Sequence, residues 1–236
     1  MKILFACDLD NTLIHSYKTC REDDICVEIY DGREQSFISA RAFELLKKLS
    51  TQIYFIPITT RSIAQYQRIF WANDFKPSFA VVTNGAYLLD GDKQENFLRE
   101  VVTPYESELK WQLASANENI FEIYRIVDDS FLFLRCRDDI DAEKIHFDTK
   151  LTVQRTGKKI YLFPPRLNKG EALKLLIKKF SPDKIIAAGD SEIDLPMLEI
   201  ANVAFIKKNL RGINHKDFVE FSTAEEFLEL ISLNLL

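Results

Sequence analysis

The sequence is poor in the residue types that build several common functional sites. Only 7 of its 236 residues are glycine, and no glycine-rich phosphate loop of the G-x-G-x-x-G or Walker type occurs. The four cysteines are scattered without a C-x-x-C pair, which gives no indication of a zinc site. The three histidines, His15, His146 and His215, are equally isolated. These absences leave carboxylates as the candidate catalytic groups.

The chain also lacks an excess of positive charge and a long apolar run. Its 31 Lys and Arg against 36 Asp and Glu give a net charge of −5, so it has no electrostatic footprint for nucleic acid or an anionic membrane. No stretch approaches the roughly 18 apolar residues of a membrane helix. The first apolar run, Ile3–Cys7, ends at Asp8 and does not resemble a secretory signal. We expect a soluble, cytoplasmic protein without nucleic-acid or membrane partners; no feature indicates an oligomeric state.

Short apolar runs alternate with segments of helical period, which is typical of an α/β fold with a parallel sheet. The expected strands of this sheet are residues 3–7, 53–58, 79–83, 184–188 and 203–206. The expected helices are residues 40–49, 62–71, 169–180 and 224–235. A hairpin is expected at residues 26–38, because Asp31-Gly32 favours a tight turn between two apolar segments.

The middle of the chain repeats the order helix, strand, strand. Helices are expected at residues 104–119 and 140–150, and strands at residues 121–127, 131–137, 151–155 and 159–163. This order predicts an antiparallel sheet with helices on one face, closed by Pro164-Pro165 as a linker. The sequence therefore predicts a core of residues 1–85 and 165–236, interrupted by an α+β insert of residues 86–164.

Acidic, hydroxyl and basic residues follow the expected strands of the core. Asp8 and Asp10 come directly after the first strand, at the edge of a parallel sheet where ligands bind. Two carboxylates this close are costly unless a cation lies between them or one stays protonated. A surface turn with a helix-capping Asp is the alternative for this pair.

Hydroxyl, basic and acidic residues also follow the other expected elements of the core. Thr59, Thr60 and Arg61 follow the second strand, although either threonine could simply cap the next helix. Lys169 opens the helix after the insert, where it opposes the helix dipole, and this indicates a nearby anion. Asp190 and Asp194 follow the strand at residues 184–188, four residues apart and able to face one side of a helical turn. Capping alone is the alternative for Asp194.

Together these motifs resemble the haloacid dehalogenase superfamily of Mg²⁺-dependent phosphohydrolases. Asp8-x-Asp10-x-Thr12 matches the first motif, Thr59 the second, Lys169 the third, and Gly189-Asp190 with Asp194 the fourth. The position of the insert, and Asn84-Gly85 after the third strand, resemble the subclass with a C2-type cap, which includes sucrose-phosphate phosphatase and the Cof-type sugar phosphatases. The resemblance implies a Rossmann-like parallel-sheet core with an inserted α+β cap domain.

The resemblance also implies roles for the motif residues. Asp8 is expected to be the nucleophile that forms an aspartyl-phosphate, and Asp10 the general acid and base. Thr59 and Lys169 are expected to hold the phosphoryl oxygens. Mg²⁺ is expected at Asp8, Asp190 and the backbone carbonyl of Asp10, with Asp194 behind these ligands.

Substrate contacts are expected from four residues near the active edge, Thr60, Arg61, Asn84 and Gly85. On the cap, Arg125, Arg135, Arg137 and Lys158 are either substrate contacts or part of a solvated strand face. The expected substrate is a small phosphorylated metabolite, with a sugar phosphate as first choice. Two alternatives stay open: a phosphotransferase or phosphomutase that uses the same site, and a non-hydrolytic phospho-acceptor signalling or binding protein.

Overall fold

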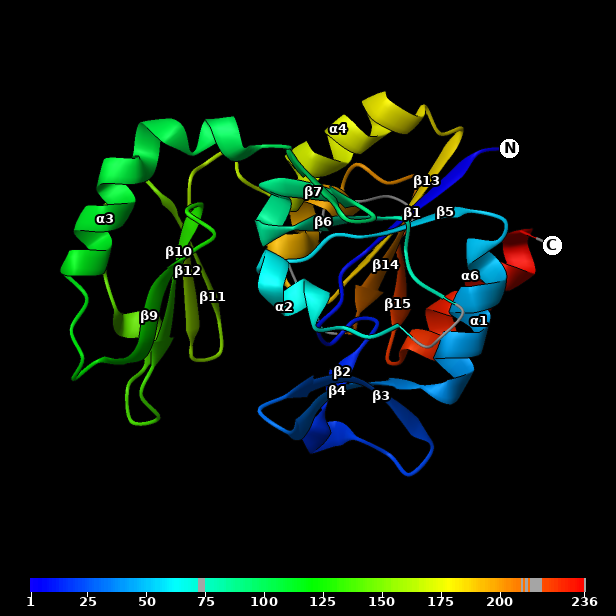
Figure 1. Ribbon diagram of the computed structural model, residues 1–236, viewed down its shortest axis with the longest axis horizontal. Coiled ribbons are helices and arrows are strands. Elements are labelled where there is room, and N and C mark those ends of the chain that lie inside the picture. The colour runs from blue at the N-terminus through cyan, green and yellow to red at the C-terminus, as the bar shows by residue number, and fades with distance from the viewer. Residues whose placement is uncertain (72–74, 209, 211, 213–217, 236) are drawn as a thin grey trace.

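The computed structural model shows two lobes side by side (Figure 1). It describes all residues except 72–74, 209, 211, 213–217 and 236, so His215 lies outside the described residues. A larger core lobe holds both chain ends, and a smaller outer lobe is formed by α3 and strands β9 to β12 (Figure 1). Among the described residues, no helix has the length and apolar character needed to span a bilayer. The α/β fold class with a parallel sheet is confirmed.

The core lobe is built on a five-stranded sheet in the order β15-β14-β13-β1-β5, with every neighbouring pair parallel. Its strands are β1 (Ile3–Cys7), β5 (Tyr54–Pro57), β13 (Lys184–Gly189), β14 (Val203–Lys207) and β15 (Phe218–Phe221). All five residues of β1 are buried, as expected for a strand covered on both faces. Since β1 lies between β5 and β13, the residues that follow these three strands meet at one edge.

Helices cover the central sheet. The pair α1 (Ala40–Ser50) and α6 (Ala224–Leu235) packs together, and so do α4 (Lys169–Phe180) and α5 (Leu195–Leu198). Side-chain caps fix where the helices begin: the Asn168 side chain accepts from the Glu171 backbone at 2.9 Å, which starts α4 at Lys169. The helix expected at residues 62–71 is shorter, α2 (Ile63–Gln67).

A three-stranded hairpin sheet lies below the core in Figure 1. It consists of β2 (His15–Ser16), β3 (Asp24–Tyr30) and β4 (Arg33–Ser39). Asp31 and Gly32 have φ values of 52° and 70°, the positive angles that a two-residue hairpin turn requires at both positions. The hairpin expected at residues 26–38 is confirmed, and it lies beside the active edge of the sheet.

The polypeptide after Gly85 stays with the core before it enters the outer lobe. Strands β7 (Tyr87–Asp90) and β8 (Lys93–Asn96), which sequence patterns did not indicate, extend antiparallel from β6 (Phe79–Val82). β6 itself bridges to the core through Ile58 and Val81. The division into a core of residues 1–85 and 165–236 and a cap of residues 86–164 stays a proposal. The structure joins β7 and β8, which this division assigns to the cap, to the core strand β6.

The outer lobe is an antiparallel sheet in the order β11-β12-β10-β9. Its elements are β9 (Phe121–Val127), β10 (Phe131–Cys136), β11 (Thr152–Thr156), β12 (Lys159–Phe163) and α3 (Glu106–Ala114). The helix expected at residues 140–150 is wrong, because only a 3₁₀ turn at Ala142–Lys144 forms. The Arg155 guanidinium accounts for the difference: it binds the carbonyls of Ala142 and Ile145 at 3.0 and 2.7 Å, which an α-helix would use internally.

One residue of the outer lobe ties it to the core. Asp128, in the turn between β9 and β10, accepts a hydrogen bond from the Ile63 backbone at 2.9 Å, at the start of α2. The same oxygen accepts from the Thr83 hydroxyl at 2.5 Å. The Tyr87 hydroxyl donates to the Asp128 carbonyl at 3.2 Å. These three bonds fix how the outer lobe faces the sheet edge.

Candidate active site

The motif residues converge where β1, β5 and β13 end. The Asp8 backbone donates to the Ala188 carbonyl at 2.9 Å, which joins the ends of β1 and β13. The Thr59 backbone donates to the Val81 carbonyl at 2.9 Å, which fixes the segment after β5. Asp8 and Thr59 are both buried. Residues more than 150 positions apart in sequence thus form one cluster.

Lys169 lies at the centre of this cluster. Its ammonium Nζ donates to Asp8 Oδ1 at 2.5 Å and to Asp194 Oδ1 at 2.6 Å, and the residue is only 1% exposed. Burial by itself lowers the pKa of Lys169, but the charges of Asp194 and Asp8 outweigh it and hold the pKa above its usual value. The position of Lys169 at a helix start predicted a nearby anion. The structure shows two, the carboxylates of Asp8 and Asp194.

Asp194 organises the loop that carries Asp190. Its Oδ2 accepts from the Asp190 and Ser191 backbones at 3.0 Å each, and from the Ser191 hydroxyl at 2.9 Å. A Cβ on Gly189 would lie 2.4 Å from the Asp194 Cβ, so only glycine fits there. Both carboxylate oxygens of Asp194 are therefore hydrogen bonded, one to Lys169 and the other to the loop of Asp190. These contacts hold Asp190 and Lys169 in place.

Three carboxylates could hold a metal ion in this cluster. Asp8, Asp190 and Asp194 each offer an oxygen, and these oxygens lie within 4.8 Å of one another. Burial, followed by the charge of Asp194, raises the pKa of Asp190 to about 6. Burial also raises the pKa of Asp8, against the lowering effect of Lys169. Crowded carboxylates with raised pKa values favour a bound cation, and an all-oxygen donor set suits Mg²⁺.

Asp10, two residues after Asp8, pairs with Arg61. The guanidinium donates from Nε to Asp10 Oδ2 and from Nη2 to Oδ1, both at 2.8 Å. The Asp10 side chain is 47% exposed, whereas that of Arg61 is 10% exposed. Burial works to raise the pKa of Asp10, but its hydrogen bonds and charge interaction with Arg61 dominate and lower it.

Glu28 from β3 completes the surroundings of Arg61. It is 3% exposed and accepts from the Arg61 Nη1 at 2.8 Å, the Ser36 hydroxyl at 2.7 Å and the Arg68 Nε at 3.1 Å. Sequence patterns did not single out Glu28, because a glutamate in an exposed-looking hairpin strand reads as a solvated side chain. The hairpin docks against the segment that follows α2, where Glu28 bridges to Ile69 and the Phe70 backbone donates to the Val27 carbonyl at 2.9 Å, and this docking buries Glu28.

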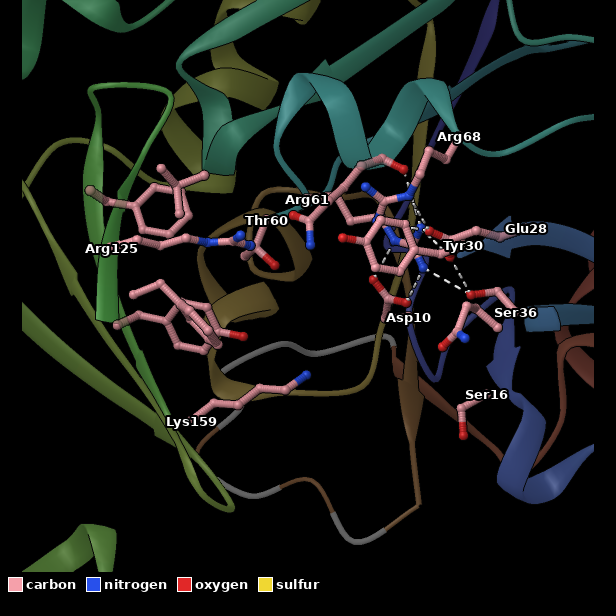
Figure 2. Close-up of a pocket in the computed structure, with 16 residues that line it drawn as sticks. Asp10, Ser16, Glu28, Tyr30, Ser36, Thr60, Arg61, Arg68, Arg125 and Lys159 are labelled. Atoms are coloured by element: carbon pink, nitrogen blue, oxygen red, sulfur yellow. Dashed lines mark hydrogen bonds and ion pairs between the residues drawn. The ribbon is translucent and has the colours of Figure 1, made fainter. Parts of the chain in front are cut away.

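A cavity of about 310 Å³ lies between the lobes, next to this network (Figure 2). The core contributes a wall of polar side chains that includes Asp10, Glu28, Thr60, Arg61 and Arg68. The outer lobe contributes Arg125, Val127, Phe131, Phe133, Lys159 and Tyr161 from β9, β10 and β12. Thr60 and Arg61 thus lie where the expected substrate contacts should be, and their role in binding stays a prediction.

Asn84 and Gly85 lie elsewhere. The Asn84 amide donates to the Leu167 carbonyl at 2.9 Å, and a Cβ on Gly85 would lie 3.0 Å from Leu98 Cδ1. Both residues are buried against the start of α4 and neither lines the cavity. Their expected substrate contacts stay predictions, and their visible contacts hold the loop after β6.

The four cap cations considered from the sequence have different surroundings. Arg125 lines the cavity. Arg135 forms an ion pair with Glu122, and Lys158 donates to the carbonyls of Asp138 and Ile140 at 2.8 and 2.7 Å. Arg137 is exposed and lies outside the cavity lining. Lys159, which sequence patterns did not separate from its neighbour Lys158, does line the cavity.

Comparison with solved structures supports the fold. The chain is similar to the sucrose-phosphatase of Synechocystis, solved with sucrose and phosphate, with a TM-score of 0.69 at 15% identity over 99% of this chain and 98% of that one. It is also similar to the C-terminal domain of the C. albicans trehalose-6-phosphate phosphatase, with a TM-score of 0.66 at 15% identity over 98% and 91% of the two chains. At such low identities the likeness shows the fold alone.

Sequence comparison supports the family. A phosphoglycolate phosphatase of Methanoculleus marisnigri is 35% identical over 115 residues, which are 46% of this chain and 48% of that protein. The match thus spans about half the length of that curated relative. The sequence model of the haloacid dehalogenase-like hydrolases matches residues 92–211, just over half of the chain, including Lys169, Asp190 and Asp194. The chain belongs to the haloacid dehalogenase-like hydrolase family.

Proposed function

We propose that the protein is a Mg²⁺-dependent phosphatase that hydrolyses a small phosphorylated metabolite through an aspartyl-phosphate on Asp8. The observation that carries this proposal is the buried contact of Lys169 with Asp8, beside Asp190 and two residues before Asp10, which lines the cavity between the lobes. A nucleophile, a cation for phosphoryl charge, an acidic metal-binding set and a proton donor thereby share one edge of the sheet.

Asp8 attacks the phosphorus of the substrate with a carboxylate oxygen in the first step, and the ester P–O bond breaks. Asp10 leaves its ion pair with Arg61, takes up a proton and gives it to the departing oxygen. The Lys169 ammonium offsets the negative charge on the phosphoryl oxygens. Asp10 then takes a proton from water as that water attacks the phosphorus. The Asp8–phosphate bond breaks, which releases inorganic phosphate and restores Asp8.

Asp8 and Asp190, with the backbone carbonyl of Asp10, would hold Mg²⁺, and Asp194 would support them because its oxygens are already hydrogen bonded. Bound Mg²⁺ supplies positive charge that allows an anionic nucleophile to approach an anionic phosphate. This chain supplies the rest of the arrangement: Lys169 fixes the rotamer of Asp8, and Asp194 fixes the loop of Asp190.

The cavity favours a small substrate. Its volume of about 310 Å³ is at the low end for small-molecule sites, and the outer lobe covers it. The named relatives act on, or were solved with, small phosphorylated or sugar compounds, which supports a metabolite such as a sugar phosphate. Free cysteines are in keeping with a reducing compartment, so we propose a cytoplasmic location. Among the described residues that line the cavity, no contact favours phosphotransfer over hydrolysis.

A phosphate-release screen over phosphorylated metabolites with Mg²⁺ tests this proposal, with Asp8→Asn as the matched variant. We expect turnover by the native protein and none above background by Asp8→Asn, whose amide is not a nucleophile. Equal turnover by the two proteins would contradict the role of Asp8. A phosphoryl group passed quantitatively to a sugar acceptor instead of water would favour the phosphotransferase alternative.

A further inference from the structure

We propose that Lys159 and Arg125 form a second anion-binding subsite, so that preferred substrates carry a second negatively charged group besides the phosphate that is removed. This inference rests on the proposed phosphatase function and names the substrate class more narrowly. The second group is a carboxylate or another phosphate, placed on the part of the substrate that leaves.

The register of the outer sheet places these two cations on one face. Phe133 of β10 pairs with Arg125 of β9 on one side and with Tyr161 of β12 on the other. Lys159 lies two residues before Tyr161, so its side chain projects from the same face. All four residues line the cavity. The face of the outer sheet that lines the cavity therefore carries Arg125 and Lys159 beside the rings of Phe133 and Tyr161. Arg135, opposite Lys159 in the register, is a third cation on this face but lies outside the cavity lining.

Both cations lack an acidic partner within the described part of the chain. The Arg125 guanidinium lies over the Phe133 ring, 5.9 Å from its centre, and has no ion pair there. The Lys159 ammonium has neither an ion pair nor a side-chain hydrogen bond there. By contrast, Arg135 pairs with Glu122, and Lys158 binds two carbonyls. Of these four outer-lobe cations, the two that line the cavity are the ones without an acidic or carbonyl partner among the described residues, and they are free to meet a ligand.

The opposite wall cannot supply that partner. Arg61 and Arg68 on the core side are matched by Asp10 and Glu28, so their charges balance. The positive charge left over in the cavity is that of Lys159 and Arg125. Figure 2 shows both side chains reaching from the outer sheet toward the core wall that carries Asp10.

The position of Asp10 identifies which part of the substrate these cations meet. The phosphate to be removed lies at Asp8 and Lys169, and Asp10 must touch the leaving oxygen to protonate it. Lys159 and Arg125 line the same cavity as Asp10 and reach toward it from the opposite wall (Figure 2). The two cations therefore face the leaving group rather than the transferred phosphate. Charge-assisted hydrogen bonds from lysine and arginine recognise carboxylate or phosphate there.

Matched substrate pairs test the subsite. The probes are 2-phosphoglycolate against 2-hydroxyethyl phosphate, and fructose 1,6-bisphosphate against fructose 6-phosphate, with kcat/KM measured for each. We expect the native protein to prefer the doubly anionic member of at least one pair. Lys159→Gln and Arg125→Gln should each lower that preference about tenfold or more, the usual effect of losing a hydrogen bond to a charged group. Lys158→Gln, in the turn before β12, and Arg135→Gln, on β10, should leave the preference as it is, because neither residue lines the cavity.

Three outcomes would overturn the subsite: no preference in the native protein, an equal loss on both members of a pair in Lys159→Gln, or the same loss in Lys158→Gln. Binding of the same probes to Asp8→Asn, measured by calorimetry, separates this inference from the proposed function. Selective binding of the doubly anionic probes without turnover in the native protein would keep the subsite and reject the phosphatase. Turnover without selectivity would keep the phosphatase function and reject the subsite.

Discussion

The guanidinium of Arg61 donates to both carboxylate oxygens of Asp10 at 2.8 Å. This contact lowers the pKa of Asp10, the expected general acid and base. Arg61→Gln should raise the pKa of Asp10, because the hydrogen bonds and the charge of the guanidinium, which lower this pKa, are lost. Titration of the Asp10 carboxyl by carbon-detected NMR in both proteins checks this. An unchanged pKa would mean that Lys159 or solvent, rather than Arg61, controls this carboxyl.

Glu28 should act as a positioning residue for Arg61. Glu28→Gln keeps the shape but removes the charge that Arg61 and Arg68 share, and we expect a loss of about 1–3 kcal/mol in the free energy of unfolding. Urea denaturation measures it. Glu34→Gln is the matched control, since Glu34 is an exposed residue of the same hairpin and its replacement should cost about 0.5 kcal/mol or less. Equal effects of the two substitutions would contradict the role of Glu28.

The parts of the site that sequence predicted are those fixed by local order along parallel strands. Asp8, Thr59 and Asp190 follow β1, β5 and β13, so their meeting follows from the topology alone. Lys169 was predicted because a cation at a helix start needs an anion. Glu28 and Lys159 were not, because burial of Glu28 depends on how a hairpin docks, and the sequence does not show that Lys158 lies in the turn while Lys159 begins β12. The helix wrongly expected at residues 140–150 has a similar origin. Arg155, which lies outside that segment, binds the carbonyls of Ala142 and Ile145, and the local sequence does not show this contact.

Asp128 should control how closely the lobes meet. Asp128→Ala removes the bonds to the Ile63 backbone and the Thr83 hydroxyl, so we expect a larger radius of gyration by small-angle X-ray scattering and a raised KM. Asp129→Ala is a close control, because both residues have positive φ, 41° and 51°, in the same turn. The cost of placing alanine in that backbone region is therefore shared. A similar expansion in Asp129→Ala would mean that turn strain, and not the lobe contact, is responsible.

Metal binding should depend on pH in a defined direction. The pKa of Asp190 is raised to about 6, so the folded state binds this proton more tightly than the unfolded chain. This contribution to stability is fully present below the unfolded value of 3.8 and is lost as pH rises through about 6. Mg²⁺ must compete with that proton. The rise in Tm on adding Mg²⁺ should therefore be larger at pH 7.5 than at pH 5.

Thermal unfolding with and without Mg²⁺ at the two pH values measures this difference, and Asp190→Asn is the control. The amide cannot titrate, so the Mg²⁺-induced rise in Tm should be small at both pH values.

Activity should disappear in EDTA and return with Mg²⁺, while Ca²⁺ should restore little because it favours more ligands and looser geometry. Full activity in chelator would show that the acidic cluster of Asp8, Asp190 and Asp194 does not serve a metal.

The proton-transfer role of Asp10 can be separated from binding through the leaving group. Asp10→Asn should still bind substrate, because Lys169 and the carbonyl of residue 10 remain, but it cannot donate or accept the proton. We expect kcat for an alkyl phosphate to fall by about 10²–10⁴, the usual contribution of a positioned acid or base. The loss should be smaller in the first step with p-nitrophenyl phosphate, whose leaving group departs without a proton. Burst kinetics with this substrate should show fast release of p-nitrophenol followed by slow hydrolysis of the Asp8–phosphate, since activation of water still needs the missing carboxylate. An equal loss for both leaving groups, without a burst, would place Asp10 outside proton transfer and leave it only the ion pair with Arg61.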